Sequence, residues 1–232
     1  MWWFTATSRF GSRRRGLTIG DELFIILTVS AIPNINRQAA RRQATQDEIV
    51  QASWEMVREH GLAGLSMRDL GQRVGMRAQS IYSYFASKHE IYDAMFLEGY
   101  QAFIDWMDDV DDDDADPISA VRRFAHAFVE FCTSDPVRYQ LLFQRTIPGF
   151  TPSPESWAVA VQWYEQTRQR LATIGVSDQP TLDLWSAMLT GLTDQQLSND
   201  PGGDRWAQLV DRAVDLLLID TRTITHNESD TT

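Results

Sequence analysis

The chain has 232 residues, of which 43% are hydrophobic, so it can bury a core and is too apolar for a disordered protein. Its formal net charge is −11, which argues against a uniformly basic binder of nucleic acid. The single cysteine, Cys132, excludes an intrachain disulfide, which fits a cytoplasmic protein. We expect Cys132 to be buried among apolar neighbours; a redox-sensing thiol is the alternative.

The charge is unevenly distributed. Residues 1–32 hold four Lys and Arg against two Asp and Glu, and residues 33–90 hold eight against six. Residues 91–232 hold nine against twenty-four. A mildly basic region therefore precedes a strongly acidic remainder, and an anionic partner would be attracted to the first and repelled by the second.

Residues 1–40 do not share the pattern of the chain that follows. Arg13–Arg15 and the apolar run Leu23–Ile32 imitate a signal peptide. Asp21 and Glu22 interrupt that imitation, however, and the apolar run is too short to cross a bilayer. We predict a poorly ordered extension here and no membrane association.

The first helix is predicted from Thr45 to His60. Thr45 and Glu48 have the spacing of a capping box, in which a hydroxyl and a carboxylate each accept a hydrogen bond from a free backbone N–H. His60 and Gly61 end the helix. Its apolar residues recur at helical spacing: Ile49, Ala52, Trp54, Met56 and Val57.

Two short helices joined by a turn are predicted next. Ser66 caps the first, with Asp69 three residues on, and Leu70 and Val74 mark its buried face. Gly75 lies where the turn needs a residue without Cβ. Such a pair of helices is a helix-turn-helix, whose second helix enters the major groove of DNA with its N-terminal residues at the base edges.

The second of these helices turns Ile81 and Phe85 inward, which leaves its first residues free for contacts outside the protein. Those first residues are small or polar: Arg77, Ala78, Gln79 and Ser80. Arg can pair with guanine, Gln with adenine, and Ala or Ser can meet a thymine methyl or a mixed edge.

Residues further along are better placed for phosphate oxygens, namely Tyr82, Ser83 and Tyr84. Ser87 and Glu90 form a third capping box, where Lys88 and free N–H groups can hold a phosphate. The arginines ahead of the first helix are equally consistent with a solvated linker or with an arm on DNA: Arg37, Arg41 and Arg42.

The stretch GLSMRDLGQRVGMRAQSIYSYFASKHEIYDAMF resembles the DNA-binding domain of the TetR family of bacterial repressors. The motifs that carry the resemblance are Gly-Leu-Ser-x-Arg-x-Leu, Val-Gly-Met and Ile-Tyr-x-Tyr-Phe-x-Ser-Lys-x-x-Ile, all in register. Many members have Gly where this chain has Gln79, so the operator sequence does not follow from relatives. The resemblance implies base and backbone contacts at Arg68, Arg77, Ala78, Gln79, Ser80, Tyr82, Ser83, Tyr84 and Lys88.

A long helix is predicted from Lys88 to about Val110, followed by an acidic run, Asp108–Asp116, that we interpret as a solvated loop. Pro and Gly then punctuate further helices, and no strand-like alternation persists. Residues after Leu218 are expected to be loose. The further helices are predicted at residues 117–133, 136–144, 154–174, 181–197 and 204–218.

Aromatic side chains are frequent on these later helices, and most must form a core. The resemblance also implies an apolar cavity between the helices that would hold an apolar or aromatic ligand. Its candidate lining residues are Phe103, Trp106, Phe128, Phe131, Tyr139, Phe143, Trp163 and Trp185. Polar groups that could orient the ligand are Tyr139, Gln140, Gln144 and Gln162.

The last two long helices carry wide apolar stripes. In TetR-like proteins such stripes form a two-fold dimer, which places two recognition helices one DNA turn apart, about 34–36 Å. No catalytic pattern is present: the four histidines lack metal-ligand spacing, and no phosphate loop occurs. His126 is interpreted as a core residue.

The sequence therefore predicts an all-α protein with a three-helix DNA-binding domain and a larger helical ligand-binding and dimerisation domain. The domains are an extension at 1–40, the helix-turn-helix domain at 41–90, the sensing domain at 91–220 and a loose tail at 221–232. We expect a homodimeric, cytoplasmic TetR-like repressor that a small apolar or aromatic ligand releases from operator DNA, with no enzyme activity, cofactor or metal. The alternative is a DNA-binding helical module whose body binds a protein partner or no ligand.

Overall fold

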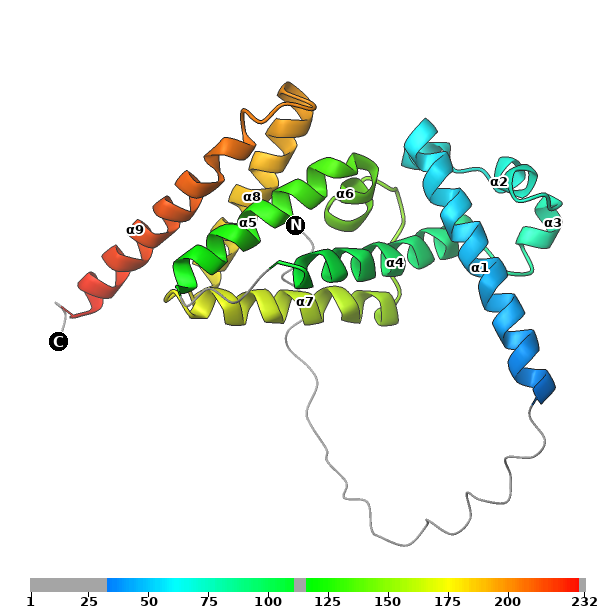
Figure 1. Cartoon of the computed structure of the whole chain (residues 1–232), viewed down its shortest axis with the longest axis horizontal. Coiled ribbons are helices and arrows are strands. Elements are labelled where there is room, and N and C mark those ends of the chain that lie inside the picture. Colours follow the sequence, from blue (N-terminus) through cyan, green and yellow to red (C-terminus); the bar gives the residue numbers. More distant parts are fainter. Residues whose placement is uncertain (1–32, 111–115, 230–232) are drawn as a thin grey trace, which may run out of the picture. The chain divides into compact units, whose positions relative to one another are not determined.

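A computed structural model describes residues 33–110 and 116–229, and the helical fold is seen in Figure 1. The all-α prediction is confirmed, since no strand occurs in those two ranges. The poorly ordered extension was predicted at 1–40; residues 1–32 of it lie outside the described residues, as does most of the acidic loop, whereas residues 33–40 belong to a helix. None of the helices in the described ranges combines the length and apolarity needed to cross a membrane.

The described residues divide into two compact units, which meet in sequence at Ile91 and Tyr92. The N-terminal unit holds α1 (Pro33–His60), the 3₁₀ turn η2 (Leu62–Gly64), α2 (Met67–Arg73) and α3 (Ala78–Ile81). Helix α4 (Lys88–Asp108) begins in this unit and continues into the C-terminal unit. The C-terminal unit also holds α5 (Pro117–Ser134), α6 (Pro136–Phe143), α7 (Pro154–Ala172), α8 (Gln179–Asn199), η3 (Ala207–Leu209) and α9 (Val210–Ser229).

Helix α1 begins well before the predicted start at Thr45. Thr45 lies inside the helix, where its hydroxyl donates to the Arg41 carbonyl at 3.1 Å instead of capping a free N–H. The prediction of a cap at Thr45 is therefore wrong. The preceding residues are rich in Ala, Arg and Gln, which favour helix and carry it through the capping-box sequence.

The buried face of the N-terminal unit is the predicted one. Ile49, Trp54 and Val57 of α1 are fully buried, as are Leu70 of α2 and Ile81 of α3. Phe85 is also buried, but α3 ends at Ile81, so Phe85 lies in the turn that follows and its N–H donates to the Ile81 carbonyl at 3.0 Å. Val74 is only half-buried.

Proline and a capping side chain start three helices of the C-terminal unit close to where the sequence predicted. Asp116, Asp135 and Ser153 cap α5, α6 and α7, each followed at once by Pro. The last helix differs from the prediction. A turn and η3 precede α9, and α9 continues beyond Leu218 to Ser229.

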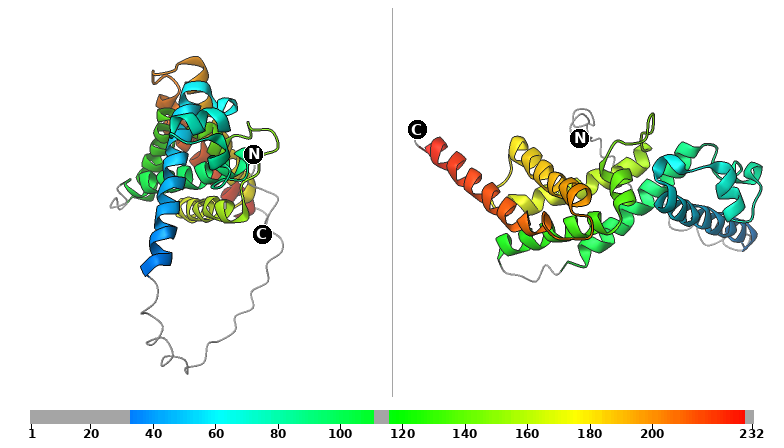
Figure 2. Two further views of the ribbon diagram at one scale, coloured as in Figure 1. Left: turned by 90° about the vertical axis from the view of Figure 1, so that its right-hand side faces the viewer. Right: turned by 90° about the horizontal axis from the view of Figure 1, so that it is seen from above.

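Helix α5 packs against both α8 and α9, and α8 packs against α9, as Figures 1 and 2 show. At the α5–α9 contact, Arg122 pairs with Asp211 and Asp215. His126 of α5 lies 3.1 Å from an Asp211 oxygen and its side chain is 46% exposed. The interpretation of His126 as a core residue is wrong, because this edge of α5 faces the acidic side of α9 rather than apolar residues.

Candidate nucleic-acid interface and sensing core

The helix-turn-helix depends on two glycines. Gly75 has a φ of 69°, the left-handed conformation predicted for the turn. Gly71, which the sequence did not single out, lies where α2 and α3 approach: a Cβ there would be 2.9 Å from the Met76 carbonyl oxygen and 3.1 Å from the Ala78 nitrogen. Both neighbours are backbone atoms, so α3 can take this position only because residue 71 has no side chain.

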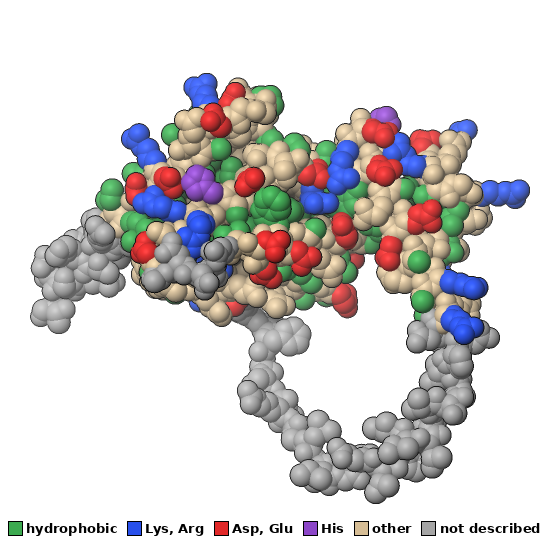
Figure 3. All heavy atoms as spheres, in the orientation of Figure 1, with side chains coloured by type: hydrophobic (Ala, Val, Ile, Leu, Met, Phe, Trp, Pro, Cys, Tyr) green, Lys and Arg blue, Asp and Glu red, His purple; other side chains and the backbone are tan. Residues whose placement is uncertain are grey.

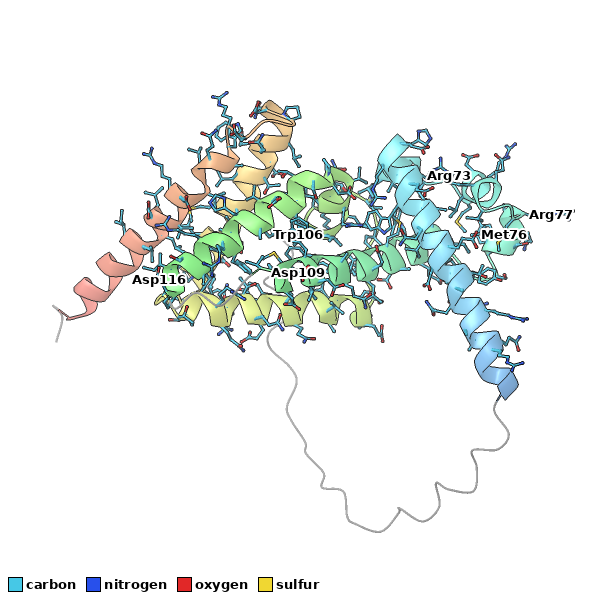
Figure 4. The ribbon with its side chains drawn as sticks, in the orientation of Figure 1. Arg73, Met76, Arg77, Trp106, Asp109 and Asp116 are labelled. Atoms are coloured by element: carbon cyan, nitrogen blue, oxygen red, sulfur yellow. The ribbon has the colours of Figure 1, made fainter. Side chains whose placement is uncertain are left out.

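The first residues of α3 form a polar tip. Arg77 is the N-cap residue in an extended conformation, and Figure 4 shows it at the outer edge of the α2–α3 pair. Gln79 and Ser80 are exposed and Ala78 is half-buried, while Ile81 on the opposite side is fully buried. One face of this short helix thus packs into the core, and the candidate base-contacting side chains lie on the other.

The chain after this tip is held by α1. The Arg42 guanidinium donates to the Ser83 carbonyl at 2.8 Å and lies over the Tyr84 ring, 5.0 Å from its centre. Gln46 donates to the Tyr84 carbonyl at 3.4 Å. Tyr82 points away and is 47% exposed. The sequence offered Arg42 as a linker or a DNA arm; its bracing of residues 83 and 84 required the three-dimensional contact.

The remaining DNA-contact candidates lie on α2 and at the start of α4. Arg68 is exposed on α2. Lys88 is half-buried and its Nζ donates to the Ala63 carbonyl at 3.3 Å, so it also braces η2. The predicted cap at Ser87 is confirmed: its hydroxyl accepts from the Glu90 N–H at 3.2 Å, and the Glu90 carboxylate accepts from the Ala86 N–H at 2.7 Å.

An ion pair between α1 and α2 also escaped the sequence analysis. Arg73 donates both guanidinium nitrogens to the Glu59 carboxylate and lies 3.5 Å from Glu55. The hydrogen bonds and charge of Arg73 lower the pKa of Glu59 below its usual 4.5. Arg73 therefore holds α2 to α1. Figure 3 shows other Lys and Arg side chains projecting from the N-terminal unit.

The candidate ligand residues of the C-terminal unit form an aromatic cluster. Phe103 lies at its centre, with ring centroids 4.6 Å from Trp163, 4.9 Å from Phe131 and 5.3 Å from Phe143. Phe128, Trp106 and Tyr139 join through further ring contacts. Trp185 of α8 is buried but outside the ring pairs found in the described residues.

Two of the four polar candidates meet on one carboxylate. The Tyr139 hydroxyl donates to Asp194 of α8 at 2.9 Å, and the Gln144 amide donates to the same oxygen at 2.7 Å. Burial, and then the bond to Asp194, raise the pKa of Tyr139. Gln140 is half-buried and Gln162 is exposed, and neither is part of this arrangement.

Tyr100 is a residue of the same cluster that the sequence analysis missed. Its ring is 4.8 Å from that of Phe96 and 5.7 Å from that of Phe143, and its side chain is 0% exposed. Within the described residues, its hydroxyl has no hydrogen-bond partner. Burial raises the pKa of Tyr100, and that of the equally buried Cys132.

An apolar groove of about 480 Å³ runs between α8 and α9. Two of the leucines that line it are exposed: Leu209 is 36% and Leu216 54% exposed. The lining residues are Ala187, Met188, Gly191, Leu192, Gln195, Trp206, Leu209, Arg212, Ala213 and Leu216.

The structure thus combines an N-terminal helix-turn-helix that has a polar, exposed tip with a larger all-helical C-terminal unit. Residues 49–95 match the family model described as bacterial regulatory proteins, tetR family. Over those residues the chain is therefore similar to the tetR family of bacterial regulatory proteins.

Curated relatives have names that agree. An HTH-type transcriptional regulator of Mycobacterium tuberculosis is 25% identical over 129 residues, which are 53% of this chain and 54% of that protein. The HTH-type transcriptional repressor KstR2 of the same species is 27% identical over 100 residues, 41% of this chain and 48% of that protein. The chain thus spans about half the length of these relatives. Their names are those of regulators and not of enzymes.

Solved structures share the fold over a longer range. The fatty acid degradation regulator FadR from Bacillus halodurans superimposes with a TM-score of 0.60 at 16% identity, over 75% of this chain and 94% of that one. The TetR-family regulator PfmR from Thermus thermophilus gives 0.54 at 23% identity, over 73% and 96%. A TetR variant from Acinetobacter baumannii in complex with minocycline gives 0.53 at 17% identity, over 76% and 95%. The described chain therefore has the all-helical fold of TetR-family regulators.

Proposed function

We propose that this protein is a transcriptional regulator: a homodimeric repressor that a small, apolar or aromatic effector releases from operator DNA. The observation that carries the proposal is the polar tip of α3, with Arg77, Gln79 and Ser80 exposed and Ile81 buried. Residues 41–90 would contact DNA, and residues 91–220 would sense the effector and dimerise. The repressor names among the relatives support this reading.

The DNA contacts divide into two kinds. Arg77, Ala78, Gln79 and Ser80 lie at the start of α3, the part of a recognition helix that reaches base edges. The others would meet phosphates and fix the register: Arg68, Tyr82, Ser83, Tyr84 and Lys88. Bracing of residues 83 and 84 by α1 supports the second assignment, because a phosphate contact needs a positioned group.

Selection of bound duplexes from a randomised DNA library tests the proposal, followed by titration of the selected duplex at several salt concentrations. Gln79→Ala should relax preference at one base position by roughly 1–3 kcal/mol. Lys88→Ala is the matched control and should weaken all sequences alike and reduce the salt dependence. Failure to enrich any duplex would sink the proposal, and equal loss of specificity in both variants would overturn the division of contacts.

The groove between α8 and α9 supports the dimer. An apolar groove with exposed Leu209 and Leu216 resembles surfaces that a partner covers, and two-fold symmetry lets the same groove serve on both copies. Leu216→Glu should give a monomer in sedimentation analysis. Val161→Glu, at a residue 44% exposed on α7 and outside the groove, should remain a dimer. A dimeric Leu216→Glu protein would contradict this interface.

The aromatic cluster supports an apolar or aromatic effector, because such a ligand is held mainly by burial against rings. The solved complex of a TetR variant with minocycline is a small-molecule complex on the same fold. The effector would weaken DNA binding only if it binds the DNA-competent and incompetent shapes unequally. Release of the selected duplex by a panel of neutral aromatic compounds tests this part.

A further inference from the structure

Tyr100 differs from the other tyrosine of the aromatic cluster in the surroundings of its hydroxyl. Tyr139 lies in the same cluster, and its hydroxyl donates to Asp194 at 2.9 Å and to the Thr190 carbonyl at 3.3 Å. The Tyr100 hydroxyl is fully buried and has no such partner in the part of the chain that the structure describes. Buried hydroxyls in proteins are nearly always paired, because an unpaired one loses its bonds to water without compensation.

Packing alone does not explain a tyrosine at this position. The ring of Tyr100 contacts Phe96, Phe103 and Phe143, and a phenylalanine would make the same contacts without the unpaired group. A hydroxyl that destabilises the fold is expected where a ligand supplies the missing partner. Binding sites are also the usual places where proteins sacrifice stability.

Phe143 provides a way to reach this hydroxyl. Its ring lies between two tyrosines, 5.7 Å from Tyr100 and 5.9 Å from Tyr139, and it packs on Phe103 and Phe128. Phe143 is the last residue of α6 and only half-buried, and residues 144–153 are not helical. A ligand ring that displaces the Phe143 side chain would inherit its aromatic neighbours and bring a substituent to the Tyr100 hydroxyl.

The chemistry around Phe143 limits the ligand. Burial keeps the Tyr100 hydroxyl protonated, so it can donate a hydrogen bond, and the ligand must supply an acceptor. Asp194 is close enough to raise the pKa of both Tyr139 and Cys132, so a negative charge nearby would be repelled. A carbonyl or hydroxyl on an uncharged ring meets both conditions.

We propose that the Tyr100 hydroxyl is the polar anchor of the effector site and that Phe143 occupies the place of the ligand ring. The ligand class is an uncharged aromatic or alicyclic molecule with one hydrogen-bond acceptor. This inference rests on the proposed function, since it assumes that the C-terminal unit senses a small molecule.

Two probe molecules of similar shape test the anchor: acetophenone, which has a carbonyl, and ethylbenzene, which has none. Ligand-observed NMR titrations of the full chain should show that acetophenone binds more tightly. Tyr100→Phe should abolish that preference, with a loss of roughly tenfold for acetophenone and little change for ethylbenzene. Without ligand, Tyr100→Phe should raise the midpoint of thermal unfolding, because it removes the unpaired hydroxyl.

Two further variants locate the site. Tyr164→Phe removes a hydroxyl that accepts a hydrogen bond from the Gln179 amide at 3.2 Å and is not one of the candidate ligand residues, so it should not raise the thermal midpoint and should leave the preference for acetophenone intact. Phe143→Ala should strengthen binding of both probes, because it vacates the ring position that they would take.

Tyr100→Phe protein that keeps the preference, or wild type that binds neither probe, overturns the proposal. The selected DNA duplex is titrated with the same samples. Normal DNA binding alongside either result would contradict the role of Tyr100 and leave the proposed regulator function intact. Failure to select any duplex would instead contradict the proposed function itself.

Discussion

The polar tip of α3 and the aromatic cluster around Phe103 differ in whether the candidate functional residues also form the hydrophobic core. In the N-terminal unit the candidate contact residues are exposed, and other side chains, such as Ile81 and Trp54, form the core. In the C-terminal unit the candidate ligand residues are themselves the core, packed ring on ring. Substitutions can therefore silence the first site in a folded protein, while most substitutions at the second should change folding and binding together.

The largest expected effect tests whether the aromatic cluster forms the core of the C-terminal unit. Phe103→Ala removes a fully buried ring that contacts several others and should cost about 3–5 kcal/mol of unfolding free energy. Trp106→Ala, one turn along α4, is the control: Trp106 is 39% exposed and donates to the Ala127 carbonyl at 3.1 Å, so its loss should be smaller. Denaturant titrations compare them, and an equal cost would contradict a cluster centred on Phe103.

Gly71→Ala should disturb the packing of α2 against α3, where there is no space for an added Cβ. The new Cβ would meet backbone atoms at 2.9 and 3.1 Å, and the resulting shift of α3 should cost roughly 1–3 kcal/mol. DNA binding should fall with it, because the tip begins at Arg77. Gln72→Ala, at the exposed neighbour on α2, should leave both unfolding and DNA titrations near wild type. A Gly71→Ala protein with normal affinity for DNA would show that α3 has room to move.

Arg42→Gln sharpens the contrast, because it should affect recognition with little effect on folding. It removes the bond to the Ser83 carbonyl and the cation over Tyr84, so affinity for the selected duplex should fall roughly fivefold. The slope of affinity against salt should stay unchanged, since Arg42 would position the phosphate-contacting residues rather than bind phosphate. A shallower slope would instead make Arg42 a direct phosphate ligand. Arg41→Gln, exposed on the same helix, is the comparison variant.

The smallest effect concerns the exposed pair of Glu59 and Arg73. Since Arg73 lowers the pKa of Glu59 in the folded protein, the pair adds stability above the usual pKa of 4.5 and loses it as pH falls through the lowered value. The thermal midpoint of Glu59→Gln should therefore be lower than that of the wild type by a constant amount near neutral pH. That difference should disappear in acid, where Glu59 is protonated. Thermal midpoints measured from pH 3 to 7 compare the variants, with Glu55→Gln as the control for a looser contact. Parallel curves for Glu59→Gln and wild type would rule out this contribution.

Local signals made much of the fold predictable. Ser66 and Ser87 cap helices as expected, Ile81 and Phe85 are buried, and proline starts α5, α6 and α7. Each of these depends on residues a few positions apart. The start of α1 failed at Thr45 because a capping sequence is also compatible with a helix interior, and the flanking residues decide between the two.

The missed parts of the sites depend on contacts between residues distant in sequence. Arg42 braces Ser83, and Asp194 gathers Tyr139 and Gln144, across long separations. Tyr100 looks like any core tyrosine in the sequence; only the surroundings of its hydroxyl distinguish it. His126 was misjudged for the same reason, because the position of α9 decides its exposure.

The burial of Cys132 allows local opening of the C-terminal unit to be measured by thiol labelling. The thiol is the only one in the chain, it is 0% exposed, and burial raises its pKa, so a thiol reagent reacts only when α5 separates from its neighbours. The labelling rate of the unmodified protein thus counts how often that region opens. A compound that binds the folded C-terminal unit should slow the reaction, whatever its effect on DNA.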